Sequence, residues 1–526
     1  MSQQTPDSAV KSRQCKLWLY CILNISLVVL LGIWFWQQNQ PVSLASPQLP
    51  ADGKLQCVSY APYYGAGQSP YIENYKVDKA QVDADMALLA QRFQCVRTYS
   101  VGQGLDYVPE AASRLGLKVL LGAWIGWGAA DNDKELALAL SLANRYPDTI
   151  TGLVVGNEVL LRQEQTPARM RAYIDQAQAQ TSVPVTYADV WEYWLRYREL
   201  ASSVDFVTVH ILPYWEDDPQ PIDRAIAHAE NVMERVQSVF DKPILIGETG
   251  WPSIGRQRGE SEPSHLNQAR YLREFVQTAQ ARGWNYNLIE AIDQPWKRVL
   301  EGTVGGYWGL YGSDLQEKFD FNGAMAERKD GLAPIYWGLA GMLIWLALAL
   351  QGRERRPSAL IAMASLGALA GSTALLQVDY LEHAARNLLE WGALAIVVAA
   401  GWLALLCLPR LMGGSDSQRT DKLLQFSIFV LLLGAAVASW YLIVDWRYRD
   451  FPLVLYALPA IQLALGYRLL GVATRSRARI HYVLGAIAVV TAVVSVAIEP
   501  NNLHIWLWAA LTAMLAYASW PLRKST

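Results

Sequence analysis

The sequence predicts an α/β protein with a (β/α)8 TIM barrel, followed by all-α transmembrane helices. Two patterns lead to this prediction: eight short apolar runs alternate with amphipathic stretches over residues 55–291, and long apolar segments lie at residues 17–36 and after about residue 335. Of the 526 residues, 52% are hydrophobic and 17% are charged, whereas soluble globular chains contain about 25% charged residues. The composition therefore excludes a wholly soluble or disordered protein.

The charge balance and the rarity of metal ligands exclude further classes. The 45 Lys and Arg against 47 Asp and Glu give a net charge of −2, and basic residues cluster only beside apolar segments. Nucleic acid is therefore not an expected partner. The five cysteines form no C-x-x-C pair and the six histidines show no metal-site spacing, so no metal is expected. Nothing in the sequence calls for a cofactor.

Residues 17–36 are predicted to form a transmembrane anchor behind a cytoplasmic N-terminus of residues 1–16. The segment is long enough to cross a hydrocarbon core of about 30 Å, and Lys11, Arg13 and Lys16 precede it. A cleaved signal peptide is the alternative, but no small-residue cleavage site directly follows. We therefore expect an uncleaved anchor.

About seven further spans are expected within residues 335–521, before a cytoplasmic tail of residues 522–526. They lie near residues 335–351, 358–377, 388–408, 423–444, 452–471, 480–498 and 503–521. Basic residues gather in alternate connections and near both termini. The positive-inside rule then predicts both termini in the cytoplasm and residues 37–333 in an extracytoplasmic compartment.

The predicted spans offer little chemistry of their own. Their acidic residues lie at span ends and not in the middle, namely Asp379, Glu382, Glu390, Asp445 and Glu499. A transporter or proton relay normally holds such groups at mid-membrane depth. We interpret the spans as an anchor, a scaffold or an interaction surface.

A linker of residues 37–54, rich in Pro, Ser and Ala, is expected before a barrel domain of residues 55–330. Strands are predicted near residues 55–60, 94–99, 118–124, 151–157, 183–189, 205–211, 243–248 and 286–291. Helices are predicted between them near residues 78–92, 105–115, 132–146, 167–180, 192–201, 221–239 and 264–282. About 250 residues is the usual length of a (β/α)8 barrel, although a doubly wound sheet would produce a similar alternation.

The placement of unusual residues directly after the strands favours the barrel, because barrel active sites lie at the C-terminal ends of the strands. Glu158 and Glu248 are the candidate catalytic residues. The candidate substrate-binding residues are Tyr63, Arg97, Tyr99, Trp124, Asn157, His210, Tyr214, Trp251, Glu290 and Trp296.

Glu158 and Glu248 each end an apolar run, where a buried carboxylate is costly unless it is paired or used. Glycoside cleavage needs one protonated carboxyl for the leaving oxygen and one carboxylate to attack the anomeric carbon. The fourth and seventh strands lie nearly opposite in an eight-strand ring, so both side chains could flank one sugar. The alternative is that each glutamate caps a helix or pairs with an arginine such as Arg97. This structural role is plausible for a single glutamate at a strand end, but less so for both.

The other candidates fit a sugar-binding cleft. The Asn157 amide suits a sugar 2-hydroxyl or a turn cap. Aromatic rings such as those of Trp124, Trp251 and Trp296 can stack on the apolar faces of sugars. His210 fits a substrate contact, a partner that orients a carboxylate, or a structural histidine.

Cys57 and Cys95 lie at the starts of predicted neighbouring strands. The expected compartment would permit oxidation. Two buried thiols are nevertheless favoured over a disulfide, because adjacent parallel strands seldom present the required geometry.

The segments VVGNEV at residues 154–159 and IGETGWPS at residues 246–253 resemble the two catalytic motifs of glycoside hydrolase family 17, the β-1,3-glucanase family. The resemblance covers roughly residues 55–325 and extends weakly to YAPYYG at 60–65 and VRTYS at 96–100. It implies a (β/α)8 barrel and a retaining reaction, with Glu158 as the acid/base and Glu248 as the nucleophile. The membrane part resembles that of bacterial inner-membrane proteins in which such a barrel faces the periplasm.

The predicted function is a membrane-anchored retaining glycosidase that acts on β-1,3-linked glucan. Some proteins of this membrane form resemble glucanosyltransferases, and hydrolysis and transglycosylation share every residue named here. A non-catalytic glucan-binding scaffold is the remaining alternative. The expected partners are a β-glucan, the lipid bilayer and, for the scaffold, a glucan synthase or exporter.

Overall fold

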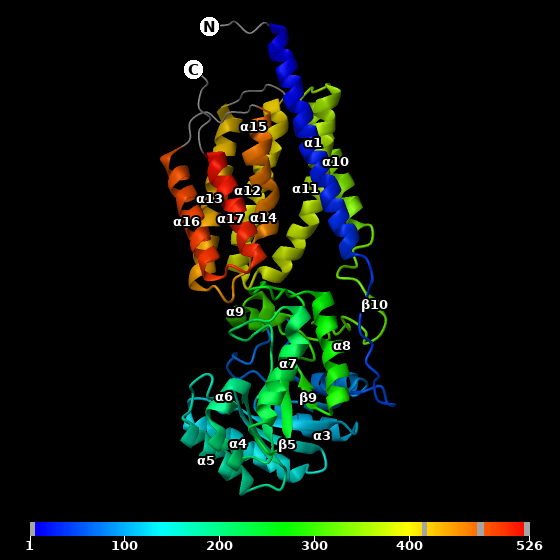
Figure 1. Cartoon of the computed structure of the whole chain (residues 1–526), viewed down its shortest axis with the longest axis vertical. Helices are drawn as coiled ribbons and strands as arrows, with labels where there is room; N and C mark the ends of the chain where they lie inside the picture. The colour runs from blue at the N-terminus through cyan, green and yellow to red at the C-terminus, as the bar shows by residue number, and fades with distance from the viewer. Residues whose placement is uncertain (1–5, 413–417, 471–477, 520–526) are drawn as a thin grey trace. The chain divides into compact units, whose positions relative to one another are not determined.

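The computed structural model describes residues 6–412, 418–470 and 478–519 (Figure 1). The chain divides into two compact units. The barrel unit comprises Val42–Ile254 and Ser261–Met325, and the helical unit comprises Met1–Pro41, Gly255–Glu260 and Ala326–Thr526.

The barrel unit confirms the predicted fold class. Eight parallel strands close into a ring in the order of the chain, from β2 to β9. They are β2 Leu55–Ser59, β3 Phe93–Arg97, β4 Lys118–Ala123, β5 Ile150–Asn157, β6 Val185–Val190, β7 Val207–His210, β8 Ile244–Thr249 and β9 Asn285–Leu288. Each strand lies within a few residues of its predicted position, because buried parallel strands are runs of Val, Ile and Leu.

The helices of the barrel unit also lie near their predicted positions. They are α2 Lys79–Leu89, α3 Val108–Ser113, α4 Ala129–Arg145, α5 Pro167–Gln178, α6 Trp191–Arg196, α7 Ile222–Gln237 and α8 His265–Arg282, with the four-residue α9 Arg298–Glu301 after the last strand. Local sequence fixes several ends. Thr166 caps α5 by accepting a hydrogen bond from the Arg169 N–H, with Pro167 in the first turn. Gly283 ends α8 with a φ of 66°.

Cys57 and Cys95 form a disulfide, which corrects the expectation of two free thiols. The two residues lie directly opposite each other in the β2–β3 register, and their Cα atoms are 4.4 Å apart. This separation falls within the range that a disulfide can bridge. The general rule about parallel strands failed because this register brings the two cysteines face to face.

The segment predicted as a linker is partly a piece of the barrel unit. Residues Val42–Ser43 form a short strand, β1, paired with β10 at Ala324–Met325. Leu44 and Leu49 pack against the barrel core. The chain thus enters and leaves the barrel unit through one antiparallel pair, and the boundary between the units falls at residues 41 and 42.

The helical unit contains six described helices that are long and apolar enough to cross a membrane. They lie within α1 Pro6–Gln38, α10 Ala333–Gln351, α11 Pro357–Ala384, α12 Leu388–Met412, α13 Gln418–Val444 and α16 Arg479–Ile498. Two shorter apolar helical segments, Leu453–Leu469 and α17 Leu503–Ser519, occupy the positions of the remaining predicted spans. The first of them begins as α14 Leu453–Ile461 and contains a π-turn at Gln462–Gly466.

Helices α10 and α11 approach closely because glycines face each other between them. A Cβ on Gly341 would collide with the backbone of Gly367, and a Cβ on Gly371 with that of Trp337. Small residues at such positions are how apolar helices pack without a hydrophobic driving force. This glycine pairing is a structural feature that hydropathy alone does not reveal.

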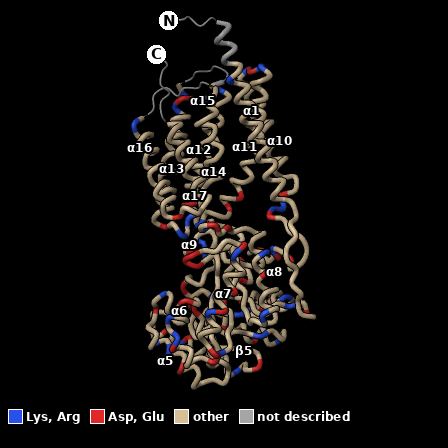
Figure 2. The backbone as a smooth tube through the Cα atoms, viewed as in Figure 1, with Lys and Arg blue, Asp and Glu red and all other residues tan. Residues whose placement is uncertain are grey.

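Charges in the helical unit gather near the helix ends, where Figure 2 colours the tube blue and red. Arg328 pairs with Asp379 at 2.5 Å, and Arg449 pairs with Glu390 at 2.8 Å. Among the described helix residues of this unit, no Asp, Glu, Lys or Arg side chain is buried. Asp379 and Glu382 lie in the last two turns of α11, and Glu390 lies in the first turn of α12, as the sequence indicates.

Candidate active site

A cavity of about 770 Å³ lies at the C-terminal ends of the barrel strands. The strand ends and the loops after them supply its walls, as expected for a (β/α)8 barrel. The lining residues on which the argument depends are Tyr63, Tyr71, Tyr99, Trp124, Asn157, Glu158, Arg162, Glu164, Glu248, Trp296, Lys297 and Glu301.

Glu158 follows β5 in a sharp turn. Gly156 has a φ of 81° and Glu158 itself a φ of 52°, so two residues of this turn are left-handed. A side chain at residue 156 would lie only 2.8 Å from a methyl group of Val159, which explains the glycine. The Glu158 side chain retains 22% exposure, and its Oε1 lies 2.9 Å from the His210 Nδ1 atom.

Glu248 lies within β8 and is more deeply buried, with 6% side-chain exposure. Its Oε1 accepts hydrogen bonds from the Arg97 Nη1 at 3.1 Å and from the Tyr99 hydroxyl at 2.9 Å. The guanidinium and the phenol both donate to this one oxygen, and together they fix the position of the carboxylate. The environment of Glu248 thus suits a nucleophile.

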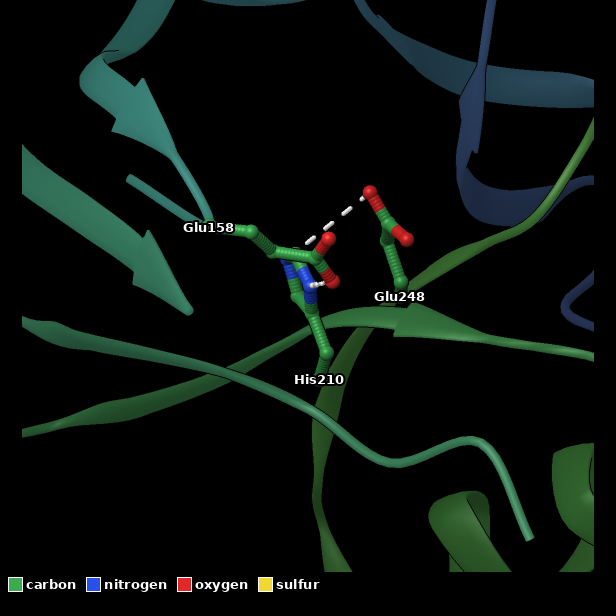
Figure 3. A group of neighbouring side chains, drawn as sticks. All are labelled: Glu158, His210 and Glu248. Carbon is green, nitrogen blue, oxygen red and sulfur yellow. Dashed lines mark hydrogen bonds and ion pairs between the residues drawn. The ribbon is translucent and has the colours of Figure 1, made fainter. Parts of the chain in front are cut away.

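The two carboxyl groups converge. Figure 3 shows Glu158 and Glu248 beside the His210 ring. One carboxylate oxygen from each glutamate and a ring nitrogen of His210 all lie within 4.8 Å of one another. Retaining glycosidases hold their carboxyl groups about 5–5.5 Å apart, and inverting enzymes about 6.5–9.5 Å apart.

Arg97 organises this pair from beneath the cavity. Its side chain is buried, with 1% exposure. Besides Glu248, it donates to the Gly247 carbonyl at 2.7 Å and to the Asn157 side-chain oxygen. It therefore links the end of β5 to β8 and orients both the nucleophile candidate and the amide next to Glu158.

The surroundings of Glu158 favour its ionised form. Burial acts to raise its pKa, but the hydrogen bond and charge of His210, together with the charges of Arg162 and Arg97, outweigh burial and hold the pKa below its usual value. Burial, reinforced by the charge of Glu248, raises the pKa of Tyr99, which therefore remains a hydrogen-bond donor.

A second acidic group adjoins the cavity after β9. Burial raises the pKa values of Glu290 and Glu301 to about 7, although Lys297 opposes the shift in both cases. The Lys297 ammonium lies 2.7 Å from Glu290. Lys297 and Glu301 line the cavity, whereas Glu290 lies behind them with 1% exposure.

The structure places the sequence-predicted residues at different depths. Those that line the cavity are Tyr63, Tyr99, Trp124, Asn157, Glu158, Glu248 and Trp296. Those that lie buried outside its wall are Arg97, His210, Tyr214, Trp251 and Glu290. Tyr214 and Trp251 pack edge to face at 5.8 Å in the barrel core, so their position after a strand reflects packing and not access to the cavity.

Sequence reasoning missed several cavity residues, namely Tyr71, Glu135, Arg162, Glu164, Trp215, Lys297, Glu301 and Trp308. Most lie in loops, where no periodic pattern marks them. Two signals were nonetheless present. Arg162 lies four residues after Glu158, and Lys297 directly follows the candidate Trp296.

Glu158, His210 and Glu248 are also close enough to approach a single cation. Their atoms already make other interactions, since His210 bonds Glu158 and Glu248 accepts from Arg97 and Tyr99. The buried Arg97 guanidinium beside Glu248 also repels a cation. This donor set fits acid/base and nucleophilic chemistry better than metal binding.

Comparison with known proteins agrees with this geometry. Residues 57–309 match the family described as the BtgE/BtgC glycoside hydrolase domain. The probable beta-glucosidase btgE of Aspergillus flavus is 27% identical over 265 residues, which are 49% of this chain and 42% of that protein. The glucan 1,3-beta-glucosidase of Candida albicans is 26% identical over 269 residues, or 47% of this chain and 87% of that protein.

Among solved structures, the glycoside hydrolase family 17 beta-1,3-glucanosyltransferase from Rhizomucor miehei is 26% identical, with a TM-score of 0.45, over 51% of this chain and 97% of that chain. The family match confirms the resemblance to glycoside hydrolases that the two glutamate motifs predict. The chain spans less than half of the length of the Aspergillus relative. All these matches concern about half of this chain, the part that forms the barrel unit.

Proposed function

We propose that this protein is a membrane-anchored retaining glycosidase that acts on β-1,3-linked glucan, with Glu248 as nucleophile and Glu158 as acid/base. The observation that carries the proposal is the convergence of two carboxylates within 4.8 Å at the end of a barrel. The names of the Candida and Aspergillus relatives support the substrate class.

In the first step, the Glu248 carboxylate attacks the anomeric carbon while Glu158 donates a proton to the glycosidic oxygen. The C–O bond to the leaving sugar breaks, and a covalent glycosyl-enzyme ester forms. Hydrogen bonds from Arg97 and Tyr99 orient Glu248 for this attack. The Asn157 amide, fixed by Arg97, is in position for a sugar hydroxyl.

In the second step, Glu158, now a carboxylate, takes a proton from an incoming water molecule. The water oxygen attacks the anomeric carbon, and the ester bond to Glu248 breaks. The lowered pKa of Glu158 favours the carboxylate that this second step requires, whereas the first step uses the protonated acid, which is the minority form in the free site. Two inversions return the original anomeric configuration.

The test is to incubate the full-length protein in detergent with laminarihexaose. We expect shorter β-1,3-oligosaccharides, and the first-formed product should be the β-anomer by NMR. Glu248→Gln should abolish turnover. Product of inverted configuration, or undiminished activity of Glu248→Gln, would contradict the proposal.

Glucanosyl transfer is the second candidate function. The cavity continues from Glu158 to Trp124, which leaves room beside the acid/base for a second sugar. A sugar hydroxyl then replaces water in the second step, and the same residues act. Products longer than laminarihexaose would indicate transfer, whereas shorter products alone would indicate hydrolysis.

We also propose the orientation predicted from charge: the apolar helices span a bacterial inner membrane, the barrel faces the periplasm and both termini lie in the cytoplasm. The Cys57–Cys95 disulfide supports an oxidising compartment for the barrel. The test is alkylation of intact cells with a maleimide that adds mass. After the treated cells are lysed in denaturant, we expect Cys57 and Cys95 to react only if the sample has also been reduced; reaction without reduction would contradict an oxidising compartment for the barrel.

The scaffold alternative is less well supported. A protein that only binds glucan for a synthase or exporter does not require a carboxylate pair organised by Arg97, Tyr99 and His210. Association with such a partner is compatible with the enzyme and would be an additional property. Stable glucan binding without turnover by the wild-type chain would favour the scaffold.

A further inference from the structure

A cluster on the Glu158 side of the cavity is not used by the two steps above. It consists of Trp124, at the end of β4, and Arg162 and Glu164, in the loop after β5. All three residues line the cavity. The Arg162 guanidinium lies over the Trp124 ring, 4.5 Å from its centroid, and donates from Nη2 to Glu164 at 2.8 Å.

The loop that carries Arg162 is firmly held. The Arg162 N–H donates to the Glu158 carbonyl at 2.9 Å, and the Leu160 N–H donates to the Tyr187 hydroxyl at 2.9 Å. The Gln165 side chain donates to the Gly126 carbonyl at 2.6 Å, which joins this loop to the one that follows Trp124. The guanidinium and the indole are therefore positioned together before any ligand arrives.

Both groups remain available to a ligand. The Arg162 side chain is 30% exposed and Trp124 is 37% exposed. Within the described part of the chain, Nη2 is the only Arg162 guanidinium nitrogen with a hydrogen bond, so the N–H groups of Nη1 can donate to a ligand, whereas Nε is buried. An exposed indole beside unused N–H donors matches a sugar ring, which presents an apolar face and a rim of hydroxyl groups.

We infer that Trp124 and Arg162 bind the sugar unit on the leaving side of the scissile bond, and bind the acceptor sugar when the reaction is transfer. This inference rests on the proposed function. The acid/base must touch the glycosidic oxygen, so the sugar that departs with that oxygen lies beside Glu158. Arg162, four residues along the same loop, is then the specificity-determining residue of this subsite.

The acceptor sugar of a transfer occupies the same position. Its hydroxyl oxygen bonds to the anomeric carbon as the ester to Glu248 breaks, and its proton passes to Glu158. The atoms balance without any further reactant. Occupancy of the Trp124–Arg162 subsite by a sugar, in place of water, thus sets the fraction of transfer.

Two substrates separate this subsite from the rest of the site. Laminarihexaose fills it, whereas laminaribiosyl β-fluoride releases fluoride and leaves it empty. For Arg162→Met in the full-length protein, we expect kcat/KM for laminarihexaose to fall about 10- to 100-fold, the scale of a lost charged hydrogen bond. We expect the initial burst of fluoride release, which reports attack by Glu248 alone, to change by less than about 3-fold, because that step needs neither a leaving sugar nor a proton from Glu158.

Arg196 provides the matched control. Its guanidinium lies over Tyr193 at 4.8 Å, but neither residue lines the cavity. Arg196→Met should leave both substrates unaffected. With the fluoride as donor and laminaritriose as acceptor, Arg162→Met should also lower the ratio of transfer to hydrolysis, while Arg196→Met should not.

Equal losses on both substrates for Arg162→Met would overturn the inference, because they would indicate a general disturbance of the site. No loss on either substrate would also overturn it. A wild-type protein that turns over neither substrate would contradict the proposed function itself. A selective loss on laminarihexaose, absent in Arg196→Met, is the result we expect.

Discussion

The barrel unit and the helical unit both bury polar side chains, but of different kinds. The barrel buries ionisable groups, among them Arg97, Asp189, Glu248, Glu290 and Asp293. The described helices of the helical unit bury mainly amides and hydroxyls, such as Asn24, Gln377, Ser439 and Gln462, and His481 is the buried ionisable side chain among their polar residues. Charged groups can transfer protons and attack carbon, whereas neutral hydrogen bonds mainly hold helices together. The comparison assigns chemistry to the barrel and architecture to the helices.

The largest expected effect comes from the barrel. Glu248→Gln should lower turnover of laminari-oligosaccharides by about 10⁴-fold or more, the scale seen when a covalent nucleophile is removed. The measurement is product formation by purified full-length protein. Substantial residual turnover would break the comparison, because the most organised buried carboxylate would then have no chemical role.

Arg97 should matter for stability as well as activity. Its removal leaves Glu248 buried without its ion-pair partner, and breaking a buried pair costs about 3–5 kcal/mol. Arg449 in the helical unit is the control, since its side chain is 23% exposed where it pairs with Glu390. Partly exposed pairs contribute about 0–1 kcal/mol.

We therefore expect Arg97→Met to lower the Tm of the barrel transition strongly in calorimetry of the full-length protein. Arg449→Met should have a small effect. Similar losses in the two variants would erase the distinction between a pair that serves a site and a pair at a helix end.

The acidic group after β9 predicts a pH dependence. Burial raises the pKa of Glu301 to about 7, above its value in an unfolded chain. The folded state therefore binds the proton more tightly than the unfolded chain does. The protonated carboxyl contributes its full stabilisation of the fold below the unfolded pKa, and this contribution is lost as pH rises through about 7.

Glu301→Gln removes that titration. We compare the free energy of unfolding of the variant with that of wild type at two pH values. This difference should favour the variant more at pH 8 than at pH 5, by on the order of 1–3 kcal/mol. Glu110→Gln on the barrel surface, where the glutamate side chain is 45% exposed, should not change the pH dependence. Parallel pH profiles for wild type and Glu301→Gln would contradict the raised pKa of Glu301, a partly buried residue of the cavity wall.

The two units also differ in how much of each the sequence could predict. In the barrel unit, the apolar runs predict all eight strands. The acidic residue at the end of two of these runs identifies Glu158 and Glu248. The cavity wall could not be predicted in this way. Arg162 reaches it from a loop and Lys297 from a short 3-10 helix, Pro295–Lys297, whereas Trp251 lies outside the wall and packs against Tyr214. The Cys57–Cys95 disulfide depends on the β2–β3 register, which no local pattern states.

In the helical unit, hydropathy located the spans but not their contacts. The close approach of Gly341 to α11 depends on which helices are neighbours, and so does the hydrogen bond from Trp402 to Gln377. Hydropathy does not predict which helices contact each other, because each helix is apolar on all sides. Nor did it indicate that residues Gly255–Glu260, seven positions after the nucleophile candidate, belong to the helical unit.

The smallest expected effect tests the architectural role of buried amides. Gln462 accepts a hydrogen bond from the Tyr20 hydroxyl at 2.7 Å and donates to Asn24 at 2.7 Å, so it ties α1 to the π-turn after α14. Gln462→Leu should cost about 0.6–1.7 kcal/mol, the range for hydrogen bonds between membrane helices. The measurement is the unfolding midpoint of the helical unit in detergent.

Thr491→Val is the matched control for Gln462→Leu. The Thr491 side chain is partly exposed, and its hydroxyl donates to carbonyls of its own helix, so its loss should not separate helices. Neither variant should alter turnover of laminarihexaose. If Gln462→Leu lowered turnover at unchanged stability, this amide would contribute to the reaction. The assignment of catalysis to the barrel unit and of a purely structural role to the helical unit would then be wrong.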